Sequence, residues 1–180
     1  MKKNTAKKHW FAVYVKMHHE RKVRDRLSAL GIENFLPIRE EIRQWSDRRK
    51  KIERLLIPMI VFVRVADNEH ITVLKQPQVS HFLTMRSERK PAVIPDKQME
   101  DFRFLVENAE NDVLISNENF DEGDWVRVIK GSLVGLEGKL IQTEGKHRIA
   151  VQIEQLGFAT VELNAGWVEV VKNNHLLSKE

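Results

Sequence analysis

Glycine and proline are separated along this chain, and the separation constrains its fold more than any other feature. All five prolines lie before residue 96, whereas seven of the eight glycines lie after residue 120. Proline restricts φ and removes an amide donor, while glycine permits left-handed turns between short strands. A chain of 180 residues can form two small domains. We therefore expect two domains with different backbone chemistry.

Net charge divides at nearly the same place. Residues 1–110 carry 23 Lys and Arg against 15 Asp and Glu, a net +8, while residues 111–180 carry 7 against 11, a net −4. The total of +4 therefore hides a basic half suited to an anionic partner and an acidic half suited to protein contact. The polar stretch 107–119 is the expected joint between them.

Several function classes are excluded by composition and spacing. The absence of cysteine excludes disulfides, thiol nucleophiles and zinc sites with Cys ligands. The histidines show no HExxH spacing, and the chain has neither a phosphate-binding GxxxxGK[ST] loop nor a nucleophile elbow. We expect no enzyme activity, no metal and no cofactor. The longest apolar stretch, 55–63, is far below the roughly 20 residues that span a bilayer, so the chain is expected to be cytoplasmic, with no membrane partner.

Periodicity in the first half predicts alternating strands and helices. Strands are expected over residues 10–15, 34–37, 57–65 and 79–85, with a charged hairpin over 40–56. Helices are expected over 20–30 and 67–75, and from residue 96 onward. The fold class is therefore α+β, an α/β sandwich in which helices cover a mostly antiparallel sheet.

The second half has the rhythm of a small β-barrel. Five short strands with glycine-bearing turns between them are expected over residues 125–129, 139–143, 148–153, 159–163 and 168–171. The strongest local motif is GDWVRVIKGSLVGLEG, residues 123–138. Its Gly131 and Gly138 would permit the positive-φ turns that fold one strand onto the next. Glycines with this role would serve any SH3-like barrel.

Residues 123–138 resemble the KOW motif of NusG-type transcription factors and of some ribosomal proteins. Residues 156–163 (LGFATVEL) are similar to a strand of the NusG C-terminal domain. In the first half, WFAVY (10–14), HERKV (19–23) and LIPMIVFV (56–63) resemble the NusG N-terminal (NGN) domain. RQWSDRRKK (43–51), VSHF (79–82) and PAVIP (91–95) look like the specialised antiterminators of the RfaH and UpxY type.

This resemblance covers roughly residues 9–171 and implies a domain order. A basic tail (1–8) precedes an NGN-like α/β sandwich (9–108), a linker (109–120), an SH3-like KOW β-barrel (121–172) and a C-terminal tail (173–180).

The resemblance also implies an apolar surface that faces the clamp helices of RNA polymerase. The matching positions are Tyr14, Ile57, Ile60, Phe82 and Met85. Around the proline the family often has Phe and Gly-Tyr or Asn-Tyr, where this chain has Ile57 and Met59-Ile60. Strand alternation must bury about half of such side chains, so each one is either surface or core. A contact to the polymerase gate loop is implied for His70 and Thr72.

Two basic groups are candidates for nucleic-acid binding. Near the expected hairpin tip, cations beside an indole could neutralise phosphates while the ring stacks on an unpaired base. These residues are Trp45, Arg48, Arg49, Lys50 and Lys51. A solubilising loop is the alternative for this run. The resemblance implies contacts to the non-template DNA strand from His19, Lys22 and Arg26 on the first helix and from Lys16 just upstream of it.

The function implied is a transcription elongation and antitermination factor that suppresses pausing and termination. Its KOW domain would recruit a protein, with ribosomal protein S10 or termination factor Rho as the implied partners. An alternative is a KOW-type RNA-binding protein of the ribosome or its assembly. A third possibility is a general NusG paralogue rather than an operon-specific one.

Overall fold

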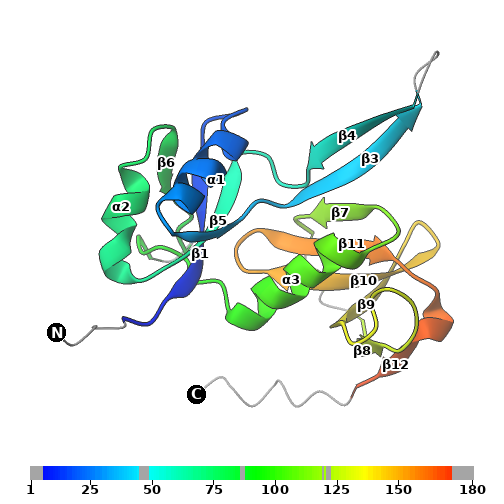
Figure 1. The fold of residues 1–180 in the computed structure, drawn as a ribbon. Helices are drawn as coiled ribbons and strands as arrows, with labels where there is room; N and C mark the ends of the chain where they lie inside the picture. The colour runs from blue at the N-terminus through cyan, green and yellow to red at the C-terminus, as the bar shows by residue number, and fades with distance from the viewer. Residues whose placement is uncertain (1–5, 45–48, 86–87, 119, 121–122, 172–180) are drawn as a thin grey trace. The chain divides into compact units, whose positions relative to one another are not determined.

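The computed structural model describes residues 6–44, 49–85, 88–118, 120 and 123–171. The chain divides into two compact units, Met1–Met99 and Glu100–Glu180, called unit 1 and unit 2 below. The colours of Figure 1 run from blue to green through unit 1 and from green to red through unit 2. Among the described residues, no helix is long and apolar enough to cross a membrane.

Unit 1 is built on a four-stranded antiparallel sheet in the order β2-β5-β1-β6 (Figure 1). Its strands are β1 (His9–Val15), β2 (Glu33–Phe35), β5 (Ile60–Val65) and β6 (Val79–Phe82). The central strands β1 and β5 are runs of apolar and β-branched residues, which suits burial on both faces. Ala12 and Val13 of β1 point to opposite faces and both are fully buried.

Helices cover one face of this sheet. They are α1 (Glu20–Ala29) and α2 (His70–Leu74), the latter preceded by a 3-10 turn, η1 (Asp67–Glu69). Val23 and Leu27 of α1 and Val73 of α2 share one core with Val13 and Val61 of the sheet. The helix α3 (Asp96–Asn108) begins in unit 1 and continues into unit 2. The expected helices are therefore confirmed.

A separate two-stranded sheet forms the charged hairpin that the sequence predicts. It pairs β3 (Ile38–Gln44) with β4 (Arg49–Leu55), and Ile38 lies opposite Leu55. The Arg21 guanidinium of α1 lies 2.9 Å from the Glu53 carboxylate of β4, which ties the hairpin to the helix. The expected tip, residues 45–48, lies outside the described residues.

Unit 2 contains a six-stranded antiparallel sheet in the order β12-β8-β9-β10-β11-β7. Its strands are β7 (Val113–Ser116), β8 (Trp125–Val128), β9 (Glu137–Thr143), β10 (Lys146–Ile153), β11 (Gly157–Glu162) and β12 (Val168–Val170). A 3-10 turn, η2 (Ala165–Trp167), precedes β12. The five expected strands are confirmed, while closure into a barrel stays a prediction.

Two details differ from the sequence prediction. The segment 109–120, expected to be a linker, contains β7, which pairs with β11 more than 40 residues further along the chain. The strand expected from residue 57 begins only at Ile60. Pro58 has no amide to donate, and Met59 has a left-handed φ of 62° that interrupts an extended strand. The other domain boundaries stay predictions.

Three loops at one end of the unit 1 sheet each contain a residue with left-handed backbone. They are residues 16–19 after β1, 57–59 before β5 and 77–78 before β6, called the strand-end loops below. The left-handed residues are His18 (φ 64°), Met59 (62°) and Gln78 (71°). None is glycine, so each costs about 1–2 kcal/mol of strain.

The two glycines singled out in the KOW-like motif, Gly131 and Gly138, serve packing in different ways. Gly131 has φ 85°, as expected for a turn, and a β-carbon there would lie 2.8 Å from the indole of Trp167. Gly138 lies inside β9, and its φ is not left-handed. The expectation of a turn at Gly138 is therefore wrong. Glycine is needed there because a β-carbon would lie 2.6 Å from the carbonyl oxygen of Ala150 on β10.

We expect Gly138→Ala to lower the free energy of unfolding of unit 2 by about 1–3 kcal/mol, because the added methyl group forces two strands apart. The matched control is Gly166→Ala, where the nearest atom is the Asn164 side-chain oxygen at 3.3 Å and the change should stay within about 0.5 kcal/mol. Chemical denaturation of both variants measures this. Equal stabilities would contradict the close approach of β9 and β10.

Candidate protein and nucleic-acid interface

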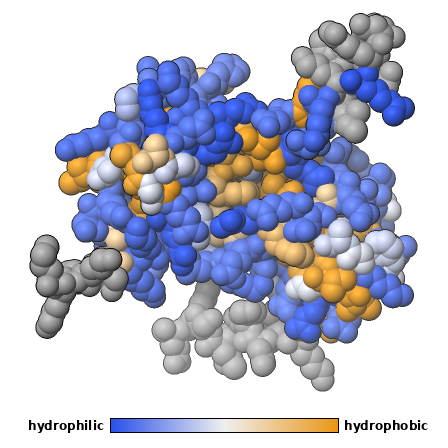
Figure 2. Space-filling view, viewed as in Figure 1, coloured by the Kyte–Doolittle hydropathy of each residue, from blue (hydrophilic) through white to orange (hydrophobic). Residues whose placement is uncertain are grey.

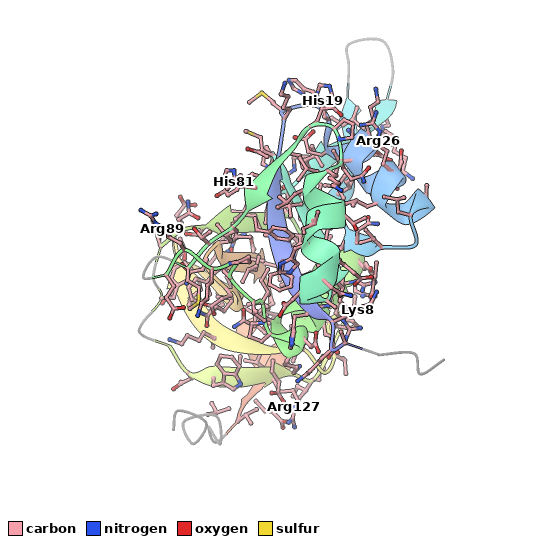
Figure 3. The ribbon with its side chains drawn as sticks, turned by 90° about the vertical axis from the view of Figure 1, so that its left-hand side faces the viewer. Lys8, His19, Arg26, His81, Arg89 and Arg127 are labelled. Atoms are coloured by element: carbon pink, nitrogen blue, oxygen red, sulfur yellow. The ribbon has the colours of Figure 1, made fainter. Side chains whose placement is uncertain are left out.

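One row of side chains crosses three strands of unit 1 near the strand-end loops. Tyr14 of β1 lies opposite Ile60 of β5 on one side and opposite His81 of β6 on the other. The Tyr14 and His81 rings stack, with centroids 4.8 Å apart and planes at 28°. His81 points away from α1 in Figure 3. Tyr14 is half-buried, His81 is exposed and Ile60 is buried.

His81 is a residue that the sequence analysis missed. Its signal lay in the alternation of β6: because Phe82 points into the core, the preceding side chain must point to the opposite face. The Ser80 hydroxyl lies 3.0 Å from His81 Nδ1, which orients the ring. Tyr14 and His81 together give the row an aromatic pair at the protein surface.

Phe82 is not part of this row, which corrects its assignment to an exposed pocket. It is only 5% exposed and belongs to the core that α1 and α2 cover. Its ring lies 5.6 Å from that of Phe11, on the face opposite to Tyr14. Ile60, at 2% exposure, is also core. Both residues support the surface from within and do not contribute exposed area to it.

Of the two residues expected to contact the gate loop from α2, His70 packs against the core and Thr72 is exposed. The His70 ring packs against the rings of Phe11 and Phe82, at centroid distances of 4.7 and 4.6 Å. Thr72 is exposed, and so are Ile71 and Leu74, which the sequence analysis did not select. Figure 2 shows apolar surface over α2 within a polar surround. The exposed part of α2 thus includes apolar as well as polar side chains.

The remaining apolar candidates surround the strand-end loops and β6. Ile57 is half-buried and Met85 is 39% exposed. Two further methionines, Met17 at 55% and Met59 at 36%, are exposed on the strand-end loops themselves. Exposed apolar side chains mark interaction surfaces where they gather, and Met17 and Met59 lie on loops that adjoin at the end of β1.

The basic residues on α1 and just before it differ in whether neighbouring groups bind their side chains. Lys16 and Lys22 are exposed. Arg26 is engaged, because its Nη1 donates to Gln78 Oε1 at 2.7 Å and to the Pro77 carbonyl at 3.4 Å. His19 is half-buried, and its Nδ1 lies 3.0 Å from the Met17 carbonyl. Both residues can be seen in Figure 3, where Arg26 lies on α1 and His19 just before its first residue. Lys16 and Lys22 are therefore the available cations of this group.

The hairpin cations are partly neutralised within the hairpin. Lys51 pairs with Glu40, and Arg54 pairs with Glu41. Arg49 lies opposite Gln44 and is exposed. Trp45, Arg48 and the side chain of Lys50 lie outside the described residues, so the proposed stacking at the tip stays a prediction. The described part of the hairpin is a surface of alternating charge rather than a purely basic one.

Unit 2 carries an open cleft of about 390 Å³ beside Trp167, which is 39% exposed. The cleft is lined by apolar residues such as Leu133 and Val161 and by charged ones such as Glu110 and Lys130. Figure 2 shows apolar surface near the β8–β9 loop, where Val134 is 53% exposed.

In the part of the chain that the structure describes, no three His, Asp or Glu side chains are placed to hold a metal ion.

Comparison with known proteins agrees with this architecture. A family model described as transcription termination factor NusG matches residues 8–103. That match covers most of unit 1, with both the Tyr14–His81 row and the strand-end loops. The chain belongs to the NusG family.

A relative matched by sequence extends the similarity beyond unit 1. The transcription termination/antitermination protein NusG of Streptococcus pyogenes serotype M3 is 24% identical over 166 residues, which covers 86% of this chain and 90% of that protein. A structure of Thermotoga maritima NusG, solved to study its domain interaction, is 23% identical, covers 92% of this chain and 98% of that chain, and gives a TM-score of 0.49. An MjSpt4:Spt5 complex is 16% identical over 91% of this chain and 99% of that chain, with a TM-score of 0.30.

Glu69, which precedes the α2 candidates, accepts a backbone hydrogen bond that favours its charged form. Its Oε2 accepts the Ala66 amide at 2.9 Å, and this hydrogen bond is the main reason that its pKa lies below the usual value of 4.5. A lowered pKa in the folded state stabilises the protein above the unfolded pKa, and the stabilisation is lost as pH falls through the folded one.

We therefore expect Glu69→Gln to lower the free energy of unfolding at pH 7 by up to about 1 kcal/mol. The difference from wild type should shrink as the pH falls below 4.5. Urea unfolding at several pH values measures it. Glu118→Gln, which changes an exposed carboxylate, is the control. A difference that is independent of pH would contradict the role of the charge.

Proposed function

We propose that this protein is a non-enzymatic, cytoplasmic transcription elongation and antitermination factor of the specialised UpxY and RfaH type. Unit 1 binds the clamp helices of RNA polymerase through the row of Tyr14 and His81 and the apolar residues around it. The observation that carries this proposal is that the family match, residues 8–103, contains an aromatic pair flanked by exposed methionines.

The mechanism is differential binding. Polymerase exchanges between an active and a paused state, and a ligand shifts this equilibrium only as far as it prefers one of them. A factor that binds the clamp in its closed form stabilises the active state. Unit 1 then suppresses pausing and termination by binding alone, without a chemical step.

Nucleic acid takes part through phosphate contacts. Lys16 and Lys22 are exposed on and next to α1, and cations of this kind add affinity and salt dependence without sequence readout. We assign them to the non-template DNA strand. His19 contacts the Met17 carbonyl within the loop that carries Lys16, and Arg26 bonds α1, the helix that carries Lys22, to residues 77–78.

Unit 2 recruits a protein partner. Residues 111–180 carry a net charge of −4, which disfavours nonspecific nucleic-acid binding. The cleft beside Trp167 and the exposed Val134 offer mixed apolar and polar area of the kind that protein partners use. Ribosomal protein S10 and Rho are the partners that family resemblance suggests.

A KOW-type RNA-binding protein of the ribosome is the alternative, and the acidic charge of unit 2 disfavours it. Affinity capture of the full chain from a lysate separates the two functions. Enrichment of RNA polymerase supports the proposal, whereas enrichment of ribosomal subunits with salt-sensitive rRNA binding supports the alternative.

We expect the full chain to reduce pausing in a single-round elongation assay, and Tyr14→Ala to weaken polymerase binding by about tenfold or more, because aromatic anchors dominate interfaces. As a control, Leu30→Ala removes an apolar side chain that is 52% exposed just after α1. This change should leave the affinity for polymerase unchanged. If saturating wild-type protein alters neither pausing nor termination, the proposal fails.

We expect the double variant Lys16→Gln/Lys22→Gln to bind single-stranded DNA more weakly. The logarithm of the association constant falls linearly with the logarithm of the salt concentration. The magnitude of this slope should decrease by about 0.7 for each phosphate that the variant no longer neutralises. Fluorescence anisotropy over a salt series measures the slope. Lys75→Gln, which removes an exposed cation at the end of α2, is the control, and an equal effect from it would contradict a site on α1.

A further inference from the structure

The strand-end loops are held together by hydrogen bonds that leave little freedom for their strained backbone. The Val15 amide donates to the Met59 carbonyl and the Lys16 amide donates to the Gln78 carbonyl, both at 2.9 Å. Arg26 adds its bond to the Gln78 side chain at 2.7 Å. All three loops are thus tied to the end of β1 or to α1.

A buried carboxylate completes this arrangement. Glu20, the first residue of α1, is only 3% exposed, and its Oε1 accepts the Met59 amide at 3.0 Å. Helix N-termini favour negative charge, which lowers the cost of burying a carboxylate there. Met59 therefore has both its amide and its carbonyl bonded while its φ stays at 62°.

The stability of the fold does not explain the methionine at this position. Glycine adopts φ near 60° without strain, whereas any residue with a β-carbon is strained there. The Met59 side chain is 36% exposed, so it is not a core residue. A strained backbone that presents an exposed apolar side chain is a pattern found at binding sites.

The neighbours of Met59 describe the partner that it fits. Ile60, the next residue, lies in register with Tyr14, so Met59 borders the row of Tyr14 and His81. The exposed Met17 belongs to an adjoining loop. A complementary surface would therefore offer an apolar recess to Met59 and Met17.

We infer that Met59 is a specificity-determining contact that inserts into such a recess on RNA polymerase, and that Glu20 is the positioning residue that holds it in place. This inference rests on the proposed function. Methionine suits the role because its flexible, polarisable side chain adapts to irregular apolar recesses.

The first test replaces Met59 with glycine in the full chain. Met59→Gly removes the side chain and the strain together, so we expect a Tm at least as high as that of the wild type. We expect its Kd for purified RNA polymerase to rise by about ten- to a hundredfold, as for the removal of one buried methionine side chain. Leu30→Ala is the matched control and should bind like the wild type. The weakening should be the same at low and high salt, because apolar contact is not screened.

The second test addresses Glu20. Glu20→Gln keeps an oxygen that can accept the Met59 amide and should retain most of the affinity, whereas Glu20→Ala should weaken binding about as much as Met59→Gly. The double variant Glu20→Ala/Met59→Gly should bind no more weakly than Met59→Gly alone, because both changes remove the same interaction with polymerase.

Each outcome decides one claim. If the wild-type chain does not bind polymerase, the proposed function is wrong. If the wild type binds and Met59→Gly binds equally well, the function stands and the inference is overturned. A Tm of Met59→Gly well below wild type would also overturn it, since Met59 would then stabilise the fold. Fully additive effects in the double variant would overturn the positioning role of Glu20.

Discussion

The antiparallel pairing of β1 with β5 and β6 is the interaction on which unit 1 depends. Its register decides which side chains point toward α1 and α2 and which point to the opposite face. Val13 and Phe82 are therefore neighbours in the core, while Tyr14 and His81 are neighbours on the other face. A shift of one residue would exchange these two sets, so packing of the core and the composition of the surface are specified together.

Much of this architecture could be predicted from sequence, because apolar periodicity and turn residues act locally. The predictions that were wrong concern features set by residues that are far apart in the sequence. Phe82 and His70 were selected because their positions match the family resemblance, but whether each side chain is exposed depends on the register of the sheet and on packing against it. β7 was missed because its pairing with β11 gives a four-residue segment a stability that its own sequence does not reveal. The left-handed φ of Met59 follows from hydrogen bonds to Val15 and Glu20, which no local pattern encodes.

Net charge, like residue type, does not reveal which side chains are available for binding. The first 110 residues have a net charge of +8, yet several of their cations are engaged by neighbours. Lys51 pairs with Glu40 across the hairpin, and Arg26 bonds to Gln78. The net charge contributes to attraction over a distance of about a Debye length, whereas close contact with phosphates is made by the cations that remain free. Lys16 and Lys22 belong to that smaller group.

The position of β7 has a consequence for where the second folding unit begins. β7 forms one edge of the unit 2 sheet, so β11 is an interior strand only when residues 113–116 are present. A polypeptide that began at the KOW-like motif would leave the amides and carbonyls along Phe158–Val161 as a new open edge. Open edges of this kind recruit strands from other molecules and promote aggregation. The compact second unit therefore starts ahead of the KOW-like motif.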